Sequence, residues 1–151
     1  MRIDIIAAGR LKKGPLYDLS QDYLGRMRWT ITLFEIESRI KDPVAMAADE
    51  RARIASKINP DHVLIALDER GKSLRSVDFA KKLDGFQGSG RPHVQFIIGG
   101  ADGLGDELRQ SADFILGLGV QTWPHMLARI MLLEQIYRAQ QILSGHPYHR
   151  E

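Results

Sequence analysis

The sequence predicts an α/β fold with a mainly parallel sheet and helices on both faces of the sheet. Short apolar runs alternate with longer segments of helical periodicity along the whole chain, which is typical of strand–helix–strand units. Glycine residues gather where the predicted strands end. The length of 151 residues is that of one domain, so we assign residues 1–151 to a single domain.

The first half of the chain predicts two strand–helix pairs. Residues 3–8 are an apolar run of strand length, and residues 15–27 begin with proline and carry apolar side chains at helical spacing. Residues 30–37 alternate with period two and are rich in β-branched side chains, as in a half-buried strand. A helix is predicted over residues 43–58, with Asp42 as its N-cap.

The second half adds three strands and three helices. Residues 62–67 are almost continuously apolar, which is expected of a strand covered on both faces. Similar short runs over residues 94–98 and 114–118 predict two more strands. Helical spacing predicts helices over residues 76–86, 106–113 and 125–143.

Composition excludes several classes of protein. The chain has 21 Lys+Arg against 19 Asp+Glu, so bulk charge does not indicate a nucleic-acid binder and any such function depends on local patches. Cysteine is absent, which excludes disulfide scaffolds, cysteine-ligated zinc, iron–sulfur centres and a cysteine nucleophile. The start of the chain is too interrupted by charge for a signal peptide, and no apolar run has membrane-spanning length. We therefore expect a cytoplasmic protein without a membrane partner.

Two common phosphate-binding motifs are not matched. The turn over residues 9–14 lacks the glycine spacing of a dinucleotide-binding fingerprint, and Gly71-Lys72-Ser73 lacks the first glycine of a Walker loop because Ala66 stands there. Ligands of parallel sheets nevertheless bind beyond the carboxyl ends of the strands, and glycine lets the backbone approach a ligand closely. The glycines that follow the predicted strands therefore favour a ligand site; they are Gly71, Gly99, Gly100, Gly103, Gly105, Gly117 and Gly119.

Four further segments carry a specific pattern. They read Phe-Ile-Ile-Gly-Gly-Ala-Asp-Gly-Leu over residues 96–104, Thr-Trp-Pro-His over 122–125, Glu-Gln-Ile-Tyr-Arg-Ala over 134–139 and His-Pro-Tyr-His-Arg over 146–150. In this order and spacing, the chain resembles the ribosomal RNA large subunit methyltransferase H family over essentially its whole length. These are small knotted methyltransferases of the SPOUT class.

The resemblance implies a trefoil-knotted α/β domain that acts as a homodimer. It also implies transfer of a methyl group from S-adenosylmethionine to N3 of a pseudouridine in large-subunit (23S) rRNA, on free rRNA or on ribosomal particles. The donor is expected to contact the backbone of three loops, namely at Leu67, at Gly99 and Gly100, and at Gly119, Val120, Gln121, Thr122, Trp123 and Pro124.

The predicted helix over residues 125–143 has apolar side chains almost all round, which implies two buried faces. We expect one face on the sheet and the other on a second subunit; the alternative is a central helix of a monomer.

Glu134 and Arg138 are four residues apart and are expected to pair, either on the surface or to hold the dimer or site in register. Arg129 is expected to bind a phosphate or the donor's carboxylate. For His125, a capping or packing role is favoured over a catalytic one.

The last residues combine stacking, charged and proton-exchanging side chains. We expect Tyr148 to stack on an unstacked base, Arg150 to bind its phosphate and His149 to accept the proton. No metal is expected, because His146 and His149 lack further obvious ligands. Two rival hypotheses are a non-catalytic RNA-binding dimer and a small nucleotide hydrolase that uses His125 or His149.

Overall fold

The computed structural model describes residues 1–149, and over those residues it contains one sheet of five strands that pair in parallel. The strands lie in the order β2-β1-β4-β3-β5. This confirms the predicted α/β fold with a parallel sheet. The strands are β1 (Arg2–Ala8), β2 (Thr30–Ile36), β3 (Val63–Ser73), β4 (His93–Ile98) and β5 (Phe114–Gly117).

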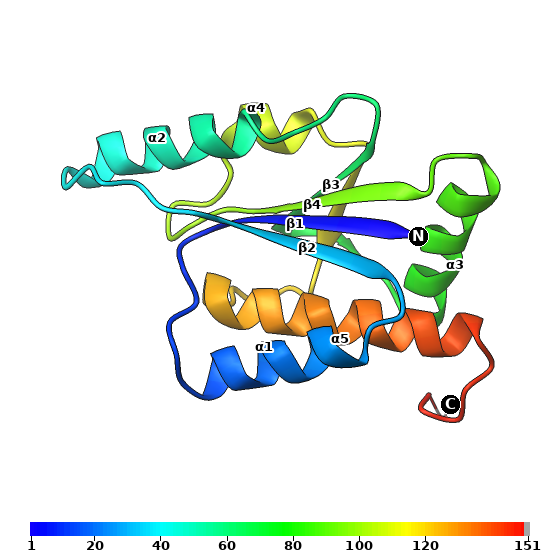
Figure 1. Cartoon of the computed structure of the whole chain (residues 1–151). Helices are drawn as coiled ribbons and strands as arrows, with labels where there is room; N and C mark the ends of the chain where they lie inside the picture. Colours follow the sequence, from blue (N-terminus) through cyan, green and yellow to red (C-terminus); the bar gives the residue numbers. More distant parts are fainter. Residues whose placement is uncertain (150–151) are drawn as a thin grey trace.

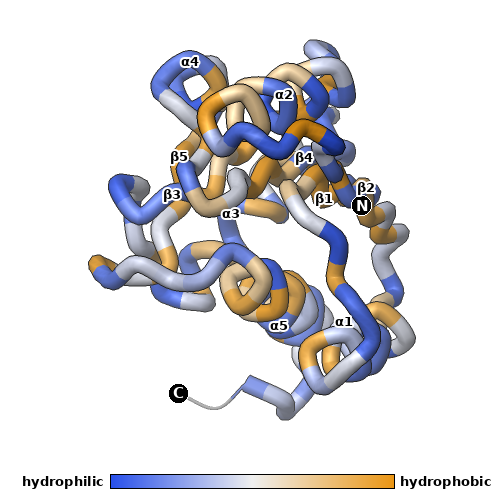
Figure 2. Tube along the Cα trace, turned by 90° about the vertical axis from the view of Figure 1, so that its left-hand side faces the viewer, coloured by the Kyte–Doolittle hydropathy of each residue, from blue (hydrophilic) through white to orange (hydrophobic). Residues whose placement is uncertain are grey.

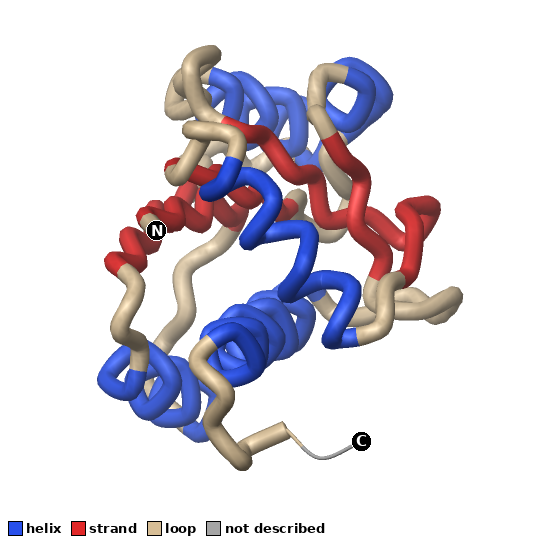
Figure 3. The backbone as a smooth tube through the Cα atoms, turned by 90° about the vertical axis from the view of Figure 1, so that its right-hand side faces the viewer, coloured by secondary structure: helices blue, strands red, loops and turns tan. Residues whose placement is uncertain are grey.

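Helices cover both faces of this sheet, as predicted (Figure 1). On one face lie α2 (Pro43–Ala55) and α4 (Gly105–Gln110). On the other lie α1 (Pro15–Arg26), α3 (Ser76–Gly88) and α5 (His125–Leu143). Figure 3, seen from the end at which the strands begin, shows these helical layers on either side of the strands. Among the helices of residues 1–149, none combines the length and the apolar character needed to cross a membrane.

The central strands place side chains alternately in two cores. In β1, Ile3 and Ile5 pack toward α1, α3 and α5, whereas Ile6 and Ala8 pack toward α2 and α4, as the two-residue period of a strand requires. Residues 94–98 of β4 are buried throughout. Because helices cover both faces of the sheet, a ligand has access to it at the ends of the strands.

An aspartate begins α2 as the sequence predicts. The carboxylate of Asp42 accepts a hydrogen bond from the backbone N–H of Ala45 over 2.9 Å. We expect Asp42→Ala to lower the free energy of unfolding by about 1 kcal/mol, because this cap satisfies a free N–H of the first turn. Urea unfolding measures the change. Asp42→Asn keeps an acceptor and should stay near the wild-type value; an equal loss in both variants would contradict the capping role.

Strand β3 contains a bulge that the sequence does not indicate. Leu67 and Lys72 both pair with Leu116 of β5, so the residues between them leave the ladder and project as a loop. Gly71 closes this loop, because a Cβ at that position would lie 2.6 Å from the backbone nitrogen of Gly117. The sequence predicts a turn at Gly71. It does not predict that residues 72 and 73 pair with β5 again, because that pairing joins segments that are distant in the sequence.

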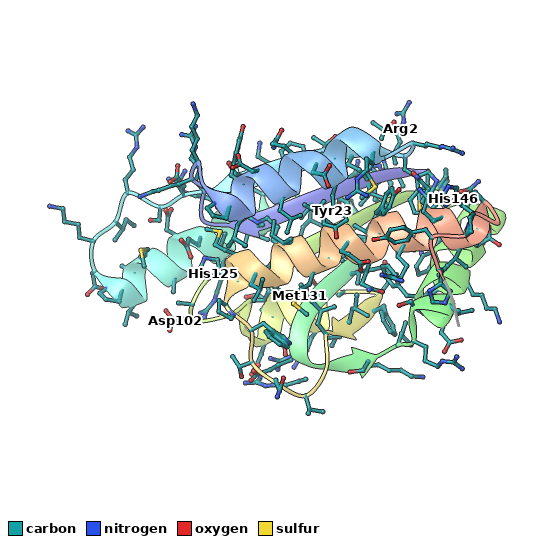
Figure 4. All side chains as sticks on the ribbon, turned by 90° about the horizontal axis from the view of Figure 1, so that it is seen from below. Arg2, Tyr23, Asp102, His125, Met131 and His146 are labelled. Atoms are coloured by element: carbon teal, nitrogen blue, oxygen red, sulfur yellow. The ribbon has the colours of Figure 1, made fainter. Side chains whose placement is uncertain are left out.

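Helix α5 is covered within one chain more fully than we predicted. Both α1 and α3 pack against it, and ten of its residues are buried. In Figure 4 the ring of Tyr23, on α1, points toward α5, and it lies 6.0 Å from the ring of Tyr137. The apolar character of α5 is therefore largely explained without a second subunit. The homodimer and the trefoil knot stay predictions.

Candidate active site

Three loops that follow β3, β4 and β5 surround a cavity of about 390 Å³, a volume within the usual range of ligand pockets. The wall from β3 is the bulge over residues 67–70, the wall from β4 is residues 98–105, and the wall after β5 includes residues 121–123. Figure 2 views the molecule from this side, where the strands end. The convergence of glycine-containing loops at this edge, predicted from the sequence, is confirmed.

The loop after β4 depends on Gly99. A Cβ at Gly99 would lie 2.6 Å from the backbone nitrogen of Leu104, so no larger residue fits without moving the backbone. The loop is closed by the N–H of Gly103, which donates to the carbonyl of Gly100 over 3.0 Å. The Oε2 atom of Glu50 lies behind Gly100, 2.7 Å from where a Cβ would stand. Burial, followed by repulsion from Asp102, raises the pKa of Glu50.

Carboxylates outnumber basic side chains in the lining of the cavity. Both arginines of the lining are paired: Arg109 lies 2.5 Å from Asp106 and 3.7 Å from Asp68, and Arg70 lies 3.8 Å from Asp106. Two carboxylates remain beyond these pairs, so the lining favours a cation over an anion. None of these charged side chains was predicted from the sequence to line a site. The charged lining residues are Asp68, Glu69, Asp102 and Asp106 against Arg70 and Arg109.

The loop before α5 is tied to the bulge of β3. The hydroxyl of Thr122 donates to the carboxylate of Glu69. The indole N–H of Trp123 donates to the carbonyl of Leu118 over 3.0 Å. The first bond joins two walls of the cavity, and the second fixes the orientation of the tryptophan side chain, which is 38% exposed.

Most of the predicted donor-contacting residues line this cavity. Val120, which is 97% exposed, does not, and neither does Pro124, the N-cap residue of α5. Gly119 lines a neighbouring cavity of about 340 Å³, whose wall also includes Glu134. The members that line the first cavity are Leu67, Gly99, Gly100, Gln121, Thr122 and Trp123.

Arg129, predicted to bind a phosphate or the donor's carboxylate, is fully buried and bonded to protein acceptors, which favours support of the site over contact with a ligand. Its guanidinium donates to Glu35 over 2.9 Å and to the carbonyls of Ala8 and Gly9 over 2.9 and 2.8 Å. Burial lowers the pKa of Arg129, and Glu35 opposes that shift. The same Glu35 oxygen accepts from the N–H of Leu11. These contacts join the end of β1 to the first turns of α5.

We expect Glu35→Gln to lower the free energy of unfolding by about 1–2 kcal/mol, because it replaces a charge-assisted hydrogen bond to buried Arg129 by a neutral one. Chemical denaturation measures the change. Glu37→Gln, on an exposed side chain of the same segment, is the matched control and should be neutral. If the two variants were equally stable, Glu35 would not support the arginine.

His125 lies at the start of α5 and lines the cavity. Burial, with a smaller contribution from Arg129, lowers the pKa of His125, so the imidazole is neutral at pH 7. This agrees with a packing role, whereas no side chain of the described residues caps α5 by a hydrogen bond. An imidazole that stays neutral in the fold but takes up a proton when unfolded makes stability fall as pH drops below about 6.5.

We therefore expect wild-type stability to decrease between neutral pH and pH 5, and we expect His125→Gln to show a shallower decrease. Thermal unfolding over this range measures both. His146→Gln, on an exposed side chain, is the control. Identical pH profiles for His125→Gln and wild type would contradict the neutral state of His125.

The tail, which we define as residues 144–149 after the end of α5, folds back onto α5 and not into the cavity of its own chain. The predicted pair of Glu134 and Arg138 is confirmed, at 2.6 Å. The hydroxyl of Tyr148 donates to Glu134 over 3.3 Å, and Nδ1 of His149 lies 3.4 Å from Arg138. Figure 4 shows His146 at one end of α5 and His125 at the other.

The tail is held mainly by aromatic and charged contacts. The rings of Tyr148 and Tyr137 meet edge to face at 4.9 Å, and the guanidinium of Arg138 lies 5.0 Å above the ring of Tyr148. Burial, followed by the negative charge of Glu134, raises the pKa of Tyr148, so this phenol keeps its proton at neutral pH. Arg150, predicted to bind phosphate, lies outside the described residues.

Comparison with known proteins identifies the family. A family model described as a predicted SPOUT methyltransferase matches residues 1–149. A protein of Rhodospirillum centenum named ribosomal RNA large subunit methyltransferase H is 47% identical, with 99% of each chain covered. A protein of the same name from Zymomonas mobilis is 43% identical, with 100% of this chain and 99% of the relative covered.

A solved structure agrees with the fold. A probable methylase family protein from Haemophilus influenzae superposes with a TM-score of 0.59 at 12% identity, covering 99% of this chain and 70% of that one. At this identity the similarity shows the fold alone. The full-length family match and the relatives at 43–47% identity carry the assignment. The chain belongs to the SPOUT methyltransferases and, among them, to the ribosomal RNA large subunit methyltransferase H family.

Proposed function

We propose that this protein transfers a methyl group from S-adenosylmethionine to N3 of a pseudouridine in large-subunit rRNA. The observation that carries the proposal is the cavity between the three loops, whose lining has two carboxylates in excess of its arginines. A sulfonium donor is a cation and is attracted by such a lining. A nucleotide polyphosphate would be repelled, which disfavours the rival hypothesis of a nucleotide hydrolase.

The protein's own groups have three tasks in this reaction: to orient, to exclude water and to accept a proton. The bound donor supplies an electrophilic methyl group. N3 of the base attacks the methyl carbon as the C–S bond breaks, and the electron pair of that bond returns to sulfur. The proton of N3 must leave, and we assign its acceptance to His149, because imidazole is the side chain best suited to exchange protons near neutral pH. No metal is needed for this chemistry.

The site is proposed to be shared between the subunits of a knotted homodimer. Tyr148 and His149 lie on Glu134 and Arg138, which are about two and a half and three and a half helical turns beyond His125 at the cavity. A tail held there does not reach the cavity of its own chain but is free to face the cavity of a partner. Apolar side chains available for such a contact are Leu19, Trp123, Met131 and Leu143, all exposed or half-buried.

The decisive experiment supplies radiolabelled donor and purified protein with free rRNA, large subunits or whole ribosomes, and maps the label. Transfer to N3 of a pseudouridine is expected, and substrates made without pseudouridine should accept less. Binding to ribosomal particles without any transfer would instead support the alternative of a non-catalytic RNA-binding dimer. Calorimetric titration with S-adenosylmethionine tests the donor site separately from the RNA.

A further inference from the structure

A second cluster of polar side chains lies at the opposite end of the strands, where they begin. Asp4 is on β1, His93 is the first residue of β4, and His62 directly precedes β3. Their ligand-type atoms lie within 4.8 Å of one another. Figure 4 labels Arg2 at this end, far from His125 and Asp102 at the donor cavity. The cluster therefore plays no part in the proposed methyl transfer.

The alternation of side chains along the strands, together with the pairing of the strands, places these three side chains on one face of the sheet. Asp4 alternates with Ile3 and Ile5, and so projects on the side of α2. The same alternation places His93 on this side, because Ile97, four residues further along β4, packs toward α2. Adjacent pairing of β1 with β4 and of β4 with β3 then brings the three together.

The contacts within the cluster bring two imidazoles and a carboxylate together and leave one imidazole nitrogen unpaired among the described residues. Nε2 of His93 lies 3.0 Å from Oδ2 of Asp4, and the rings of His62 and His93 are stacked at 3.6 Å. Nδ1 of His62 is buried without a hydrogen-bond partner in the described structure. The amide of Gln95 donates to Asp4 over 3.1 Å, in the way that outer residues orient metal-binding carboxylates.

We propose that Asp4, His62 and His93 bind a divalent transition metal, with Zn²⁺ as the best fit. Two imidazoles and one carboxylate are a recurring zinc ligand set, in which ligands at about 2.0–2.2 Å from the metal lie about 3.3 Å apart. The separation of His93 and Asp4 already fits this geometry. Asp4 and His93 are 14% and 25% exposed, so water can reach the site and complete a fourth position.

The surrounding charges do not oppose a cation. The guanidinium of Arg91, which lies beside the cluster, donates to the backbone carbonyl of His62 and pairs with Asp113 at 3.5 Å. Its charge is thereby partnered. A metal here would tie together the starts of three adjacent strands, so it would act on stability and leave the donor cavity unchanged.

Zinc titration of chelator-treated protein by calorimetry tests the proposal. One Zn²⁺ per chain is expected, with a higher melting temperature in its presence. His62→Phe keeps an aromatic ring to stack on His93 but removes the nitrogen ligand, and should weaken binding by more than the roughly 100-fold that loss of an outer-shell partner costs. His146→Phe, in the tail, is the matched control and should bind zinc as wild type does.

A second measurement detects the bound metal directly and does not depend on the stability of the protein. Co²⁺ bound in a four-coordinate site gives visible absorption bands, which should appear in wild type and in His146→Phe but not in His62→Phe or His93→Gln. If zinc produces no saturable heat, or if His62→Phe binds it as tightly as wild type does, the proposal is wrong. The cluster is then a hydrogen-bonded and stacked group only.

Discussion

Gly99→Ala is expected to abolish measurable binding of S-adenosylmethionine. The added Cβ would lie 2.6 Å from the backbone nitrogen of Leu104, a distance that can be relieved only by moving the loop after β4. This loop forms one wall of the cavity, and the donor is expected to contact its backbone, so its displacement removes contacts that no side chain can replace. Overpacking of this kind also costs about 1–3 kcal/mol of stability.

Calorimetric titration measures the lost affinity, and thermal unfolding measures the stability. Gly85→Ala is the matched control, because Gly85 lies in α3 with nothing within 4 Å of an added Cβ. It should keep donor binding and gain about 0.5–1 kcal/mol from the better helix former. A folded Gly99→Ala protein that binds the donor with wild-type affinity would contradict the placement of the donor in this cavity.

The order of the strands and helices could be predicted from the sequence because each element has a local signal. The apolar runs of the buried strands, the period-two pattern of residues 30–37 and the aspartate before α2 all gave elements found in the structure. Helix α2 ends at Ala55, three residues before the predicted end, and residues 56–58 continue as turns. Asn59 and Pro60 favour a helix end just before them, but α2 ends earlier than this local signal indicates.

The site could be predicted only in part. Glycines indicate where the backbone can come close to a ligand, but they do not indicate the charges of the side chains that line the cavity. The sequence indicated which loops meet, yet it contained no signal that Arg109 of α4 pairs with Asp68 in the lining of the cavity. The same holds for Glu35 and Arg129, which are distant in sequence and pair only because β2, β1 and α5 are neighbours in space. Pairings of this kind depend on tertiary packing, which periodicity does not report.

His149→Ala is expected to lower the rate of methyl transfer by about 10²–10⁴-fold, the usual contribution of a positioned proton acceptor. Donor affinity should be unchanged, because His149 lies on Arg138 and does not line the donor cavity. Single-turnover methylation of ribosomal particles measures the rate, and His146→Ala, on an exposed side chain of the same tail, is the matched control. A wild-type rate in His149→Ala would assign the proton to another acceptor.

Mixing two inactive variants tests whether the tail serves the partner's cavity. Gly99→Ala retains a normal tail, and His149→Ala retains a normal cavity. If the tail acts across the dimer, each mixed dimer contains one site with both normal parts, so an equal mixture that exchanges subunits regains about a quarter of the wild-type activity. If the tail serves its own chain, every site in the mixture carries a defect and no activity returns. Recovery would therefore explain why the tail is anchored on α5 by Glu134 and Arg138, away from the cavity of its own chain: the pair would hold the proton acceptor in register for the neighbouring subunit.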